Sequence, residues 1–236
     1  MARIYAGTSG WAYATWKPDF YPAKLPASRF LQHYASQLNS VEVNYTFRTL
    51  LSEKLARRWL EATPAEFTFS LKAHQMFTHL RRLQPDADFT RRFFTCITPL
   101  AQEQRLGAVL FQLPPNLKGD APLLRAFLDS LPKGFRAAFE FRHQSWFSEA
   151  VFDTLKQFGA ALCVAESDDF ETPDVPTAGF AYYRLRKESY SPARRKALAE
   201  HFVNLRAAGR DVYAYYKHED TPEGALHARE LLQAAG

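Results

Sequence analysis

Short apolar runs alternate with longer amphipathic segments along the chain. The short runs are rich in β-branched and aromatic residues and predict strands at residues 3–8, 40–44, 67–72, 108–113, 137–142, 160–165, 181–186 and 212–217. Apolar residues recur at helical spacing in residues 28–37, 52–62, 89–104, 121–131, 150–158, 192–208 and 225–234. Strands and helices therefore follow one another through the sequence, which is typical of a parallel sheet covered by helices.

This alternation predicts one α/β domain over residues 1–236. About eight parallel strands in a chain of 236 residues fit a single (β/α)8 TIM-type barrel, allowing for irregularities, and an open doubly wound sheet is the alternative. No internal repeat, low-complexity stretch or Gly/Ser-rich linker marks a domain boundary. In such a barrel the functional site lies at the carboxyl ends of the strands.

Polar side chains gather at these carboxyl ends and share one face of each strand. The pairs are Glu42 and Asn44, Ser70 and Lys72, Glu140 and Arg142, and Arg184 and Arg186. Because residues two apart in a strand point to the same side, each pair faces one way and its apolar neighbours face the other. We therefore expect one polar pocket at the barrel mouth.

Two carboxylates and one lysine are the candidate catalytic groups. Glu42 and Glu140 can divide acid and base roles, although a structural ion pair inside the barrel is an equal alternative. Arg142 is expected to keep Glu140 ionised, which suits a base or a positioning group. Lys72 is the expected partner of Glu42. Acidic neighbours would raise the pKa of Lys72, which favours an electrostatic role over Schiff-base chemistry.

The basic side chains indicate the ligand. The side chains expected to converge on the mouth are Arg142, Arg184, Arg186, Lys72 and Lys217. Guanidinium groups match the geometry of phosphate and carboxylate groups. Asn44 and Gln112 add neutral hydrogen-bonding groups, and Trp11 or Trp146 can supply a stacking face for a sugar or nucleobase. A small anionic or polyhydroxylated ligand is therefore predicted.

The first predicted strand ends in a loop with its own binding potential. Gly7 and Gly10 flank Thr8 and Ser9 and permit close backbone approach, so exposed amides there could hold a phosphate or carboxylate. The loop then carries aromatic residues at positions 11, 13, 16, 20 and 21. These aromatics either stack on a ligand or fold back into the protein core.

Histidines follow three of the predicted strands. His79, His143 and His218 can act as proton shuttles or as hydrogen-bonding partners at strand ends. No local metal-binding spacing is present, so no metal or other cofactor is predicted. The alternative is a divalent metal held by groups from several strands, drawn from Glu42, His79, Glu140, His143, Glu166, Asp168 and His218.

Composition and charge limit the class of protein. With 47% apolar residues the chain can form a large core, and its formal charge of +5 weakly favours anionic partners, nucleic acid included. Two isolated cysteines, the lack of a signal-peptide pattern and the lack of an apolar run of about 20 residues predict a cytoplasmic protein without a membrane segment. Nothing in the composition indicates an oligomeric state.

Several sequence blocks occur together across nearly the whole chain. They include Gly7-Thr8-Ser9-Gly10-Trp11, Val41-Glu42-Val43-Asn44, Thr78-His79, Gln112-Leu113-Pro114-Pro115, Phe139-Glu140-Phe141-Arg142-His143 and Tyr183-Arg184-Leu185. In this combination the chain resembles the YecE-like family, a domain of unknown function (DUF72). The resemblance implies a TIM-barrel-like fold and no established reaction. Arg186-Lys187 and Tyr216-Lys217-His218 stand where many members have His-Gly and Phe-Asn-Asn, which makes this chain locally more basic.

Three functions remain open at this point. The first is an enzyme or binder for a small anionic or polyhydroxylated compound at a cationic, carboxylate-bearing mouth. The second is a nucleic-acid-binding or phosphodiester-hydrolysing protein, which the positive charge and the basic residues 194–196 favour. The third is a non-catalytic ligand-binding barrel, because no nucleophile and base pair is recognisable.

Overall fold

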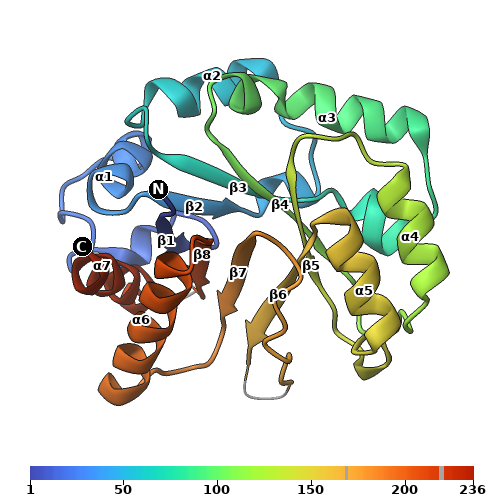
Figure 1. Ribbon diagram of the computed structural model, residues 1–236. Helices are drawn as coiled ribbons and strands as arrows, with labels where there is room; N and C mark the ends of the chain where they lie inside the picture. The colour runs from blue at the N-terminus through green and yellow to red at the C-terminus, as the bar shows by residue number, and fades with distance from the viewer. Residues whose placement is uncertain (168–169, 218–220) are drawn as a thin grey trace.

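Eight parallel strands surrounded by helices form the molecule (Figure 1). The computed structural model describes residues 1–167, 170–217 and 221–236. The strands are β1 (Ile4–Thr8), β2 (Ser40–Val43), β3 (Thr68–Lys72), β4 (Leu106–Gln112), β5 (Arg136–Glu140), β6 (Ala161–Glu166), β7 (Phe180–Leu185) and β8 (Asp211–Tyr216). Their order, β1-β8-β7-β6-β5-β4-β3-β2, is that of a nearly closed (β/α)8 barrel.

Helices connect most successive strands and cover the outside of the sheet (Figure 1). The α-helices are α1 (Phe30–Gln37), α2 (Glu53–Glu61), α3 (Ala87–Gln102), α4 (Ala121–Asp129), α5 (Glu149–Phe158), α6 (Pro192–Ala207) and α7 (Glu223–Ala235). Short helical turns occupy Ala14–Trp16, Ala27–Arg29, Tyr45–Phe47, Met76–Leu80 and Gln144–Trp146. Four α-helices begin after a polar N-cap whose side chain accepts a backbone N–H, namely Ser52, Asp86, Asp120 and Ser191.

The connection from β6 to β7 differs from the others. Its described residues, 167 and 170–179, contain no helix. The outer faces of these two strands, with Val164, Tyr183 and Leu185, therefore border a groove of about 1370 Å³ whose other wall includes α6. None of the α-helices in the described part of the chain is long and apolar enough to cross a membrane.

Side chains complete the barrel between β1 and β2. The amide of Asn39 bonds to the backbone of β1 twice, because Ala6 N donates to Asn39 Oδ1 at 2.9 Å and Asn39 Nδ2 donates to Ile4 O at 2.8 Å. Asn39 thus takes the position that a neighbouring strand would occupy, which satisfies polar backbone groups of β1.

Tyr34 makes a second bridge across the same seam. Its hydroxyl accepts from Thr8 N at 2.8 Å and donates to Ser40 O at 3.1 Å. The two strands approach closely beside this bridge, and a Cβ at Gly7 would lie only 1.9 Å from Ser40 O. Only glycine fits there, which accounts for the first glycine of the block at residues 7–11.

Tyrosine side chains fill the middle of the barrel. Tyr215 shares a hydrogen bond with Ser40 Oγ at 2.7 Å and donates to Ser70 Oγ at 2.8 Å. Below it, Tyr213 stacks on Tyr5 with ring centroids 4.7 Å apart. Because these rings and hydroxyls occupy the interior, the barrel is a packed core and not a channel.

The structure confirms the predicted TIM-type barrel. Each of the eight predicted strands and seven predicted helices is present, with ends that differ by a few residues. The aromatic loop after β1 packs into the core, since Trp16 and Tyr21 are 0% exposed and Phe20 is 4% exposed. Of the two alternatives for these three residues, the structural one is correct.

Candidate functional site

Arg184 on β7 lies at the centre of the barrel mouth, between carboxylates from β2 and β5. Its Nη2 and Nε donate to Glu42 Oε1 at 2.7 and 3.1 Å, and its Nη1 donates to Glu140 Oε2 at 2.5 Å. All three side chains are at most 1% exposed. Strand parity therefore directs the polar residues of three different strands to one buried point, as expected.

The other oxygens of the two carboxylates also have partners. Tyr182, two residues before Arg184 on the same face of β7, donates to Glu42 Oε2 at 2.7 Å. Gln112 donates to Glu140 Oε1 at 2.9 Å, and Arg142 donates to the same oxygen at 2.8 Å. Each carboxylate is thus enclosed by donors, and this network explains how two acids can be buried without protonation.

The network holds both carboxylates in the ionised form. Burial alone would raise the pKa of Glu42 and Glu140, but the opposing effect of Arg184 is supplemented by Tyr182 at Glu42 and by Arg142 and Gln112 at Glu140. The pKa of each acid is consequently below its ordinary value, and well below it for Glu140. Neither group has a proton to give near neutral pH, so the geometry favours positioning over general-acid chemistry.

Lys72 lies on the same face but outside this network. The prediction that it pairs with Glu42 is wrong, because Arg184 takes that place. The Lys72 ammonium instead lies over the ring of Phe47, 4.1 Å from the centroid, and no ion pair within 4.0 Å joins it to a described carboxylate. Burial, followed by the positive charge of Arg184, lowers the pKa of Lys72 to about 8. Glu42 and Glu140 act in the expected direction and raise this pKa, but burial and Arg184 outweigh them, so the expected net rise is wrong.

Further basic groups lie near Lys72 and Arg184. The pKa of His79 is lowered by burial and by the charges of Lys72 and Arg142, which places the three groups within electrostatic range of one another. The pKa of Arg186 is also lowered, first by burial and then by Arg184. Arg142 has 41% of its side chain exposed and therefore faces both Glu140 and solvent.

Two neutral groups complete the mouth at the ends of β1 and β2. Asn44 Nδ2 donates to Ser9 O at 3.2 Å, which links the two strand ends. Among the described residues, the buried Ser9 Oγ and Asn44 Oδ1 have no hydrogen-bond partner. Unsatisfied buried polar atoms are uncommon in proteins, which makes these two atoms a candidate donor and a candidate acceptor.

The backbone amides of the first loop are not open to an anion at Thr8 and Ser9. Thr8 N donates to Tyr34, and Ser9 N donates to Tyr216 O at 3.2 Å. The Thr8 hydroxyl is likewise engaged, because it donates to Gly10 O at 2.7 Å. The prediction that the amides of Thr8 and Ser9 bind an anion is therefore wrong. Of these two residues, only the Ser9 side chain is a candidate ligand-binding group.

Other predicted ligand-binding residues have structural contacts. Trp146 is 0% exposed, stacks on Phe141 at 4.7 Å and donates to Leu117 O, so it offers no stacking face to a ligand. Trp11 is partly buried against the edge of Trp59 at 5.4 Å.

The remaining loop positions lie at the ends of β5 and β8. His143 caps the turn Gln144–Trp146, where its Nδ1 accepts from Ser145 N. Lys217 is exposed at the end of β8, and His218 lies outside the described residues.

Two contributors to the mouth were missed by reasoning from the sequence. Tyr182 lies two residues before Arg184, so the alternation of side chains along β7 predicts that it shares the face of Arg184 and Arg186. Phe47 lies in a turn rather than a strand, and no periodic pattern marks it as a neighbour of Lys72.

A metal site receives no support from the described residues, which contain no group of three or more His, Cys, Asp or Glu side chains arranged to bind an ion. Asp168 and His218, two members of the proposed ligand set, lie outside the described residues.

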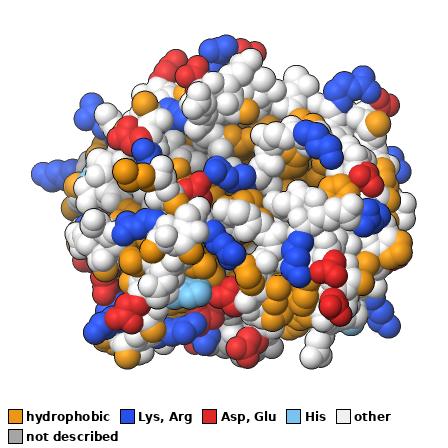
Figure 2. All heavy atoms as spheres, in the orientation of Figure 1, with side chains coloured by type: hydrophobic (Ala, Val, Ile, Leu, Met, Phe, Trp, Pro, Cys, Tyr) orange, Lys and Arg blue, Asp and Glu red, His pale blue; other side chains and the backbone are white. Residues whose placement is uncertain are grey.

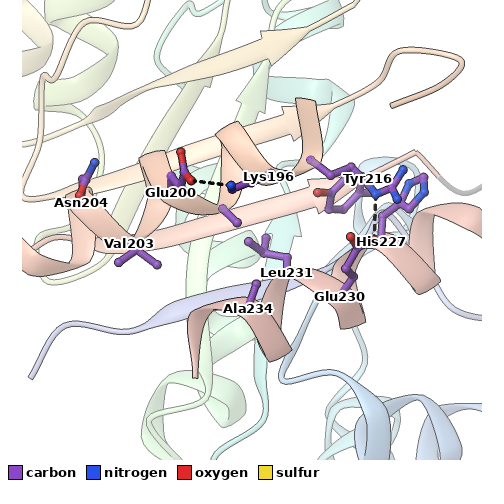
Figure 3. A pocket seen from close by; sticks show the side chains of 11 residues that line it. Lys196, Glu200, Val203, Asn204, Tyr216, His227, Glu230, Leu231 and Ala234 are labelled. Carbon is purple, nitrogen blue, oxygen red and sulfur yellow. Dashed lines mark hydrogen bonds and ion pairs between the residues drawn. The ribbon is translucent and has the colours of Figure 1, made fainter. Parts of the chain in front are cut away.

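The basic residues 194–196 are engaged on the outer surface. Their partners are Glu166 at 2.9 Å from Arg194, Glu230 at 2.8 Å from Arg195 and Glu200 at 3.9 Å from Lys196. Two of these pairs border a hollow of about 670 Å³ between α6 and α7, and no mouth residue lines it (Figure 3). Basic and acidic side chains are also interspersed on the face shown in Figure 2. Neither the hollow between α6 and α7 nor the face shown in Figure 2 has the continuous basic character typical of a nucleic-acid interface.

Together, the fold and the mouth define a TIM-barrel protein with a buried Arg-carboxylate cluster. The chain belongs to the family described as "Protein of unknown function DUF72", which matches residues 5–236. It is 27% identical to the UPF0759 protein YunF of Bacillus subtilis over 97% of this chain and 76% of YunF. It is 33% identical to the UPF0759 protein YecE of Escherichia coli over 62% of this chain and 51% of YecE. The YecE-like resemblance is thereby confirmed.

Solved structures agree with this assignment. A DUF72 family protein from Thermotoga maritima is 27% identical and superposes with a TM-score of 0.87 over 98% of both chains. A DUF72 family protein from Enterococcus faecalis, 16% identical, has a TM-score of 0.80 over 98% of this chain and 95% of its own. An endo-beta-1,4-glucanase from Xanthomonas axonopodis, at 10% identity and a TM-score of 0.51 over 98% of this chain and 99% of its own, shares the fold alone.

Proposed function

We propose that this protein binds a small anionic compound at the barrel mouth and acts on it or senses it there. The observation that carries the proposal is the charge balance of the cluster. Among the described residues, two carboxylates, Glu42 and Glu140, face three cationic side chains that interact electrostatically with them. The three are Lys72, Arg142 and Arg184. An excess of positive charge in a partly desolvated site is costly unless an anion neutralises it.

The residues fall into two layers with different roles. Glu42 and Glu140 hold the Arg184 guanidinium and are positioning residues. Lys72 and Arg142 form the anion-binding layer, where the planar guanidinium of Arg142 can bind a phosphate or carboxylate in a bidentate manner. This arrangement supports an anionic ligand over a neutral sugar, because a sugar would leave the charge excess uncompensated.

Ligand-induced stabilisation provides the test. The protein is titrated with inorganic phosphate, sulfate and oxalate, with glycerol as a neutral comparison, and the melting temperature is measured. An anion present at 100 times its Kd stabilises the folded state by about 2.7 kcal/mol, which raises Tm by roughly 5–11 °C in a domain of this size.

Variants identify the binding site. Lys72→Met and Arg142→Gln each remove one charged hydrogen-bonding group, so the anion Kd is expected to rise about tenfold or more, from about 1.5–3 kcal/mol per group. Lys196→Gln is the matched control, because Lys196 is 80% exposed on α6 and pairs only loosely with Glu200 at 3.9 Å. Equal weakening by Lys72→Met and Lys196→Gln would show nonspecific binding and refute the proposal.

A further inference from the structure

Lys72 differs from its cationic neighbours in the mouth. Arg142 and Arg184 have carboxylate partners within 2.8 Å, whereas the Lys72 ammonium lies against the face of Phe47. Its charge is therefore stabilised by an aromatic quadrupole and opposed by burial and by Arg184. An amine in this setting loses its proton more readily than one held by a carboxylate.

We propose that Lys72 forms a reversible imine with a carbonyl carbon of the anionic compound bound at the mouth. The ligand class is thus a small oxo acid or an aldehyde or ketone that carries a phosphate or carboxylate. This inference rests on the proposed function, because Arg142 would hold the anionic group while Nζ reaches the carbonyl. Lys72 is the last residue of β3 and is half-buried, so the sheet holds its backbone in place at the mouth.

The chemical step requires no oxidant or reductant. The neutral Lys72 amine attacks the carbonyl carbon and forms a carbinolamine. The C–O bond then breaks, and the oxygen leaves as water after taking one proton from the amine nitrogen and one from solvent. A protonated C=N bond remains, and addition of water reverses the step.

The deprotonated fraction gives the expected reactivity. The pKa of Lys72 is about 8, so roughly a tenth of its amine is neutral at pH 7, compared with well under a thousandth for an amine with a pKa near 10.4. Imine formation at Lys72 should therefore exceed that at an ordinary surface lysine by a factor on the order of one hundred.

The experiment uses glyoxylate as the probe and borohydride reduction to trap the imine. The purified wild-type chain is treated at pH 7 and over a series of pH values on either side of pH 8, and peptide mapping by mass spectrometry quantifies the carboxymethyl group left on each lysine. Label concentrated on Lys72, at least tenfold over exposed Lys196 and half-maximal near pH 8, is the expected result. Labelling of Lys72 no greater than that of Lys196 overturns the proposal.

Two further arms separate this inference from the proposed function. Lys72→Arg keeps a positive charge, so it should retain most of the stabilisation by oxalate while the selective label disappears. If oxalate stabilises the wild-type chain but Lys72 is not selectively labelled, anion binding stands and imine formation is refuted. In a competition arm, oxalate is added during the glyoxylate labelling. If Lys72 is selectively labelled although no anion raises Tm and oxalate does not slow the labelling, imine formation stands and the anion-binding proposal fails.

Discussion

Replacing Arg184 by methionine removes the guanidinium that joins Glu42 on β2 to Glu140 on β5. Methionine preserves much of the volume of the side chain, so the main consequence is electrostatic. Two carboxylates that are at most 1% exposed would lose three hydrogen bonds from Arg184, with donor–acceptor distances of 2.5–3.1 Å. Breaking a buried ion pair in this way costs about 3–5 kcal/mol. For a domain of this size that corresponds to a fall in Tm of roughly 6–20 °C.

The pH dependence tests the cause of this loss. In the wild-type protein the pKa values of Glu42 and Glu140 are lowered, so the stability they contribute is complete above about pH 4.3 and is lost as pH falls below it. Without Arg184, burial dominates and is expected to raise both pKa values above those of the unfolded chain. The folded variant then binds more protons than the unfolded chain, and its stability should rise as pH falls from 7 towards 5.

Urea unfolding at several pH values between 5 and 7 measures both effects. Arg57→Met is the matched control, because the Arg57–Glu53 pair is 64% and 67% exposed and its loss should leave stability nearly unchanged. Adding Glu140→Gln to Arg184→Met should recover part of the loss, since one unpaired buried charge disappears. An Arg184→Met variant that loses no more than about 1 kcal/mol and keeps the wild-type pH dependence would show that the buried network is not what stabilises the mouth.

Four further outcomes follow from the contacts. Asn39→Ala should lower the free energy of unfolding by about 1–3 kcal/mol, because it leaves backbone groups of β1 without partners. The control Ser36→Ala, at an exposed position of α1, should be nearly neutral. Equal effects of the two substitutions in urea unfolding would show that Asn39 does not stabilise the junction of β1 and β2. Trp146→Ala should cost about 3–5 kcal/mol without changing the Tm shift induced by phosphate. Lys72→Met should stabilise the unliganded protein by about 1 kcal/mol at pH 7, because it removes a partly buried charge. A large loss of stability in calorimetry would show that burial of the Lys72 amine does not destabilise the protein. Sulfate affinity of the wild-type chain should fall as pH rises through about 8, because Lys72 loses its charge while sulfate keeps its own. A flat profile in titration calorimetry would exclude a role of Lys72 in anion binding.

The architecture was predictable because it depends on periodicity. Alternation with a period of two identifies strands, and the carboxyl ends of parallel strands must meet at one end of a barrel. The same parity correctly assigned Glu42, Glu140 and Arg184 to one interior. The status of Trp146 was not predictable, because a tryptophan in a loop can be exposed or buried with the same local sequence, and only tertiary packing on Phe141 decides it.

Which cation pairs with which carboxylate depends on the position of each side chain along the barrel axis. The alternation of side chains along a strand does not determine that position. The register of β2 against β3 sets Glu42 beside Ser70, so Lys72 lies two residues, or about 6.6 Å, further towards the mouth. The long Arg184 side chain instead reaches Glu42 from β7 at the level of the carboxylate. Proximity of β2 and β3 in the sequence therefore indicated the wrong cation.

This difference in height also accounts for the contrast between the two cations. Arg184 keeps its charge because it lies at the level of both carboxylates, which raise its pKa despite burial. Lys72 lies one layer above, where the positive charge of Arg184 reinforces the effect of burial and lowers its pKa. If Arg184 is removed, the unpaired carboxylates should raise the pKa of Lys72. The pH at which glyoxylate labelling of Lys72 is half-maximal should therefore move upward in Arg184→Met, and an unchanged midpoint would disprove electrostatic coupling between the two layers.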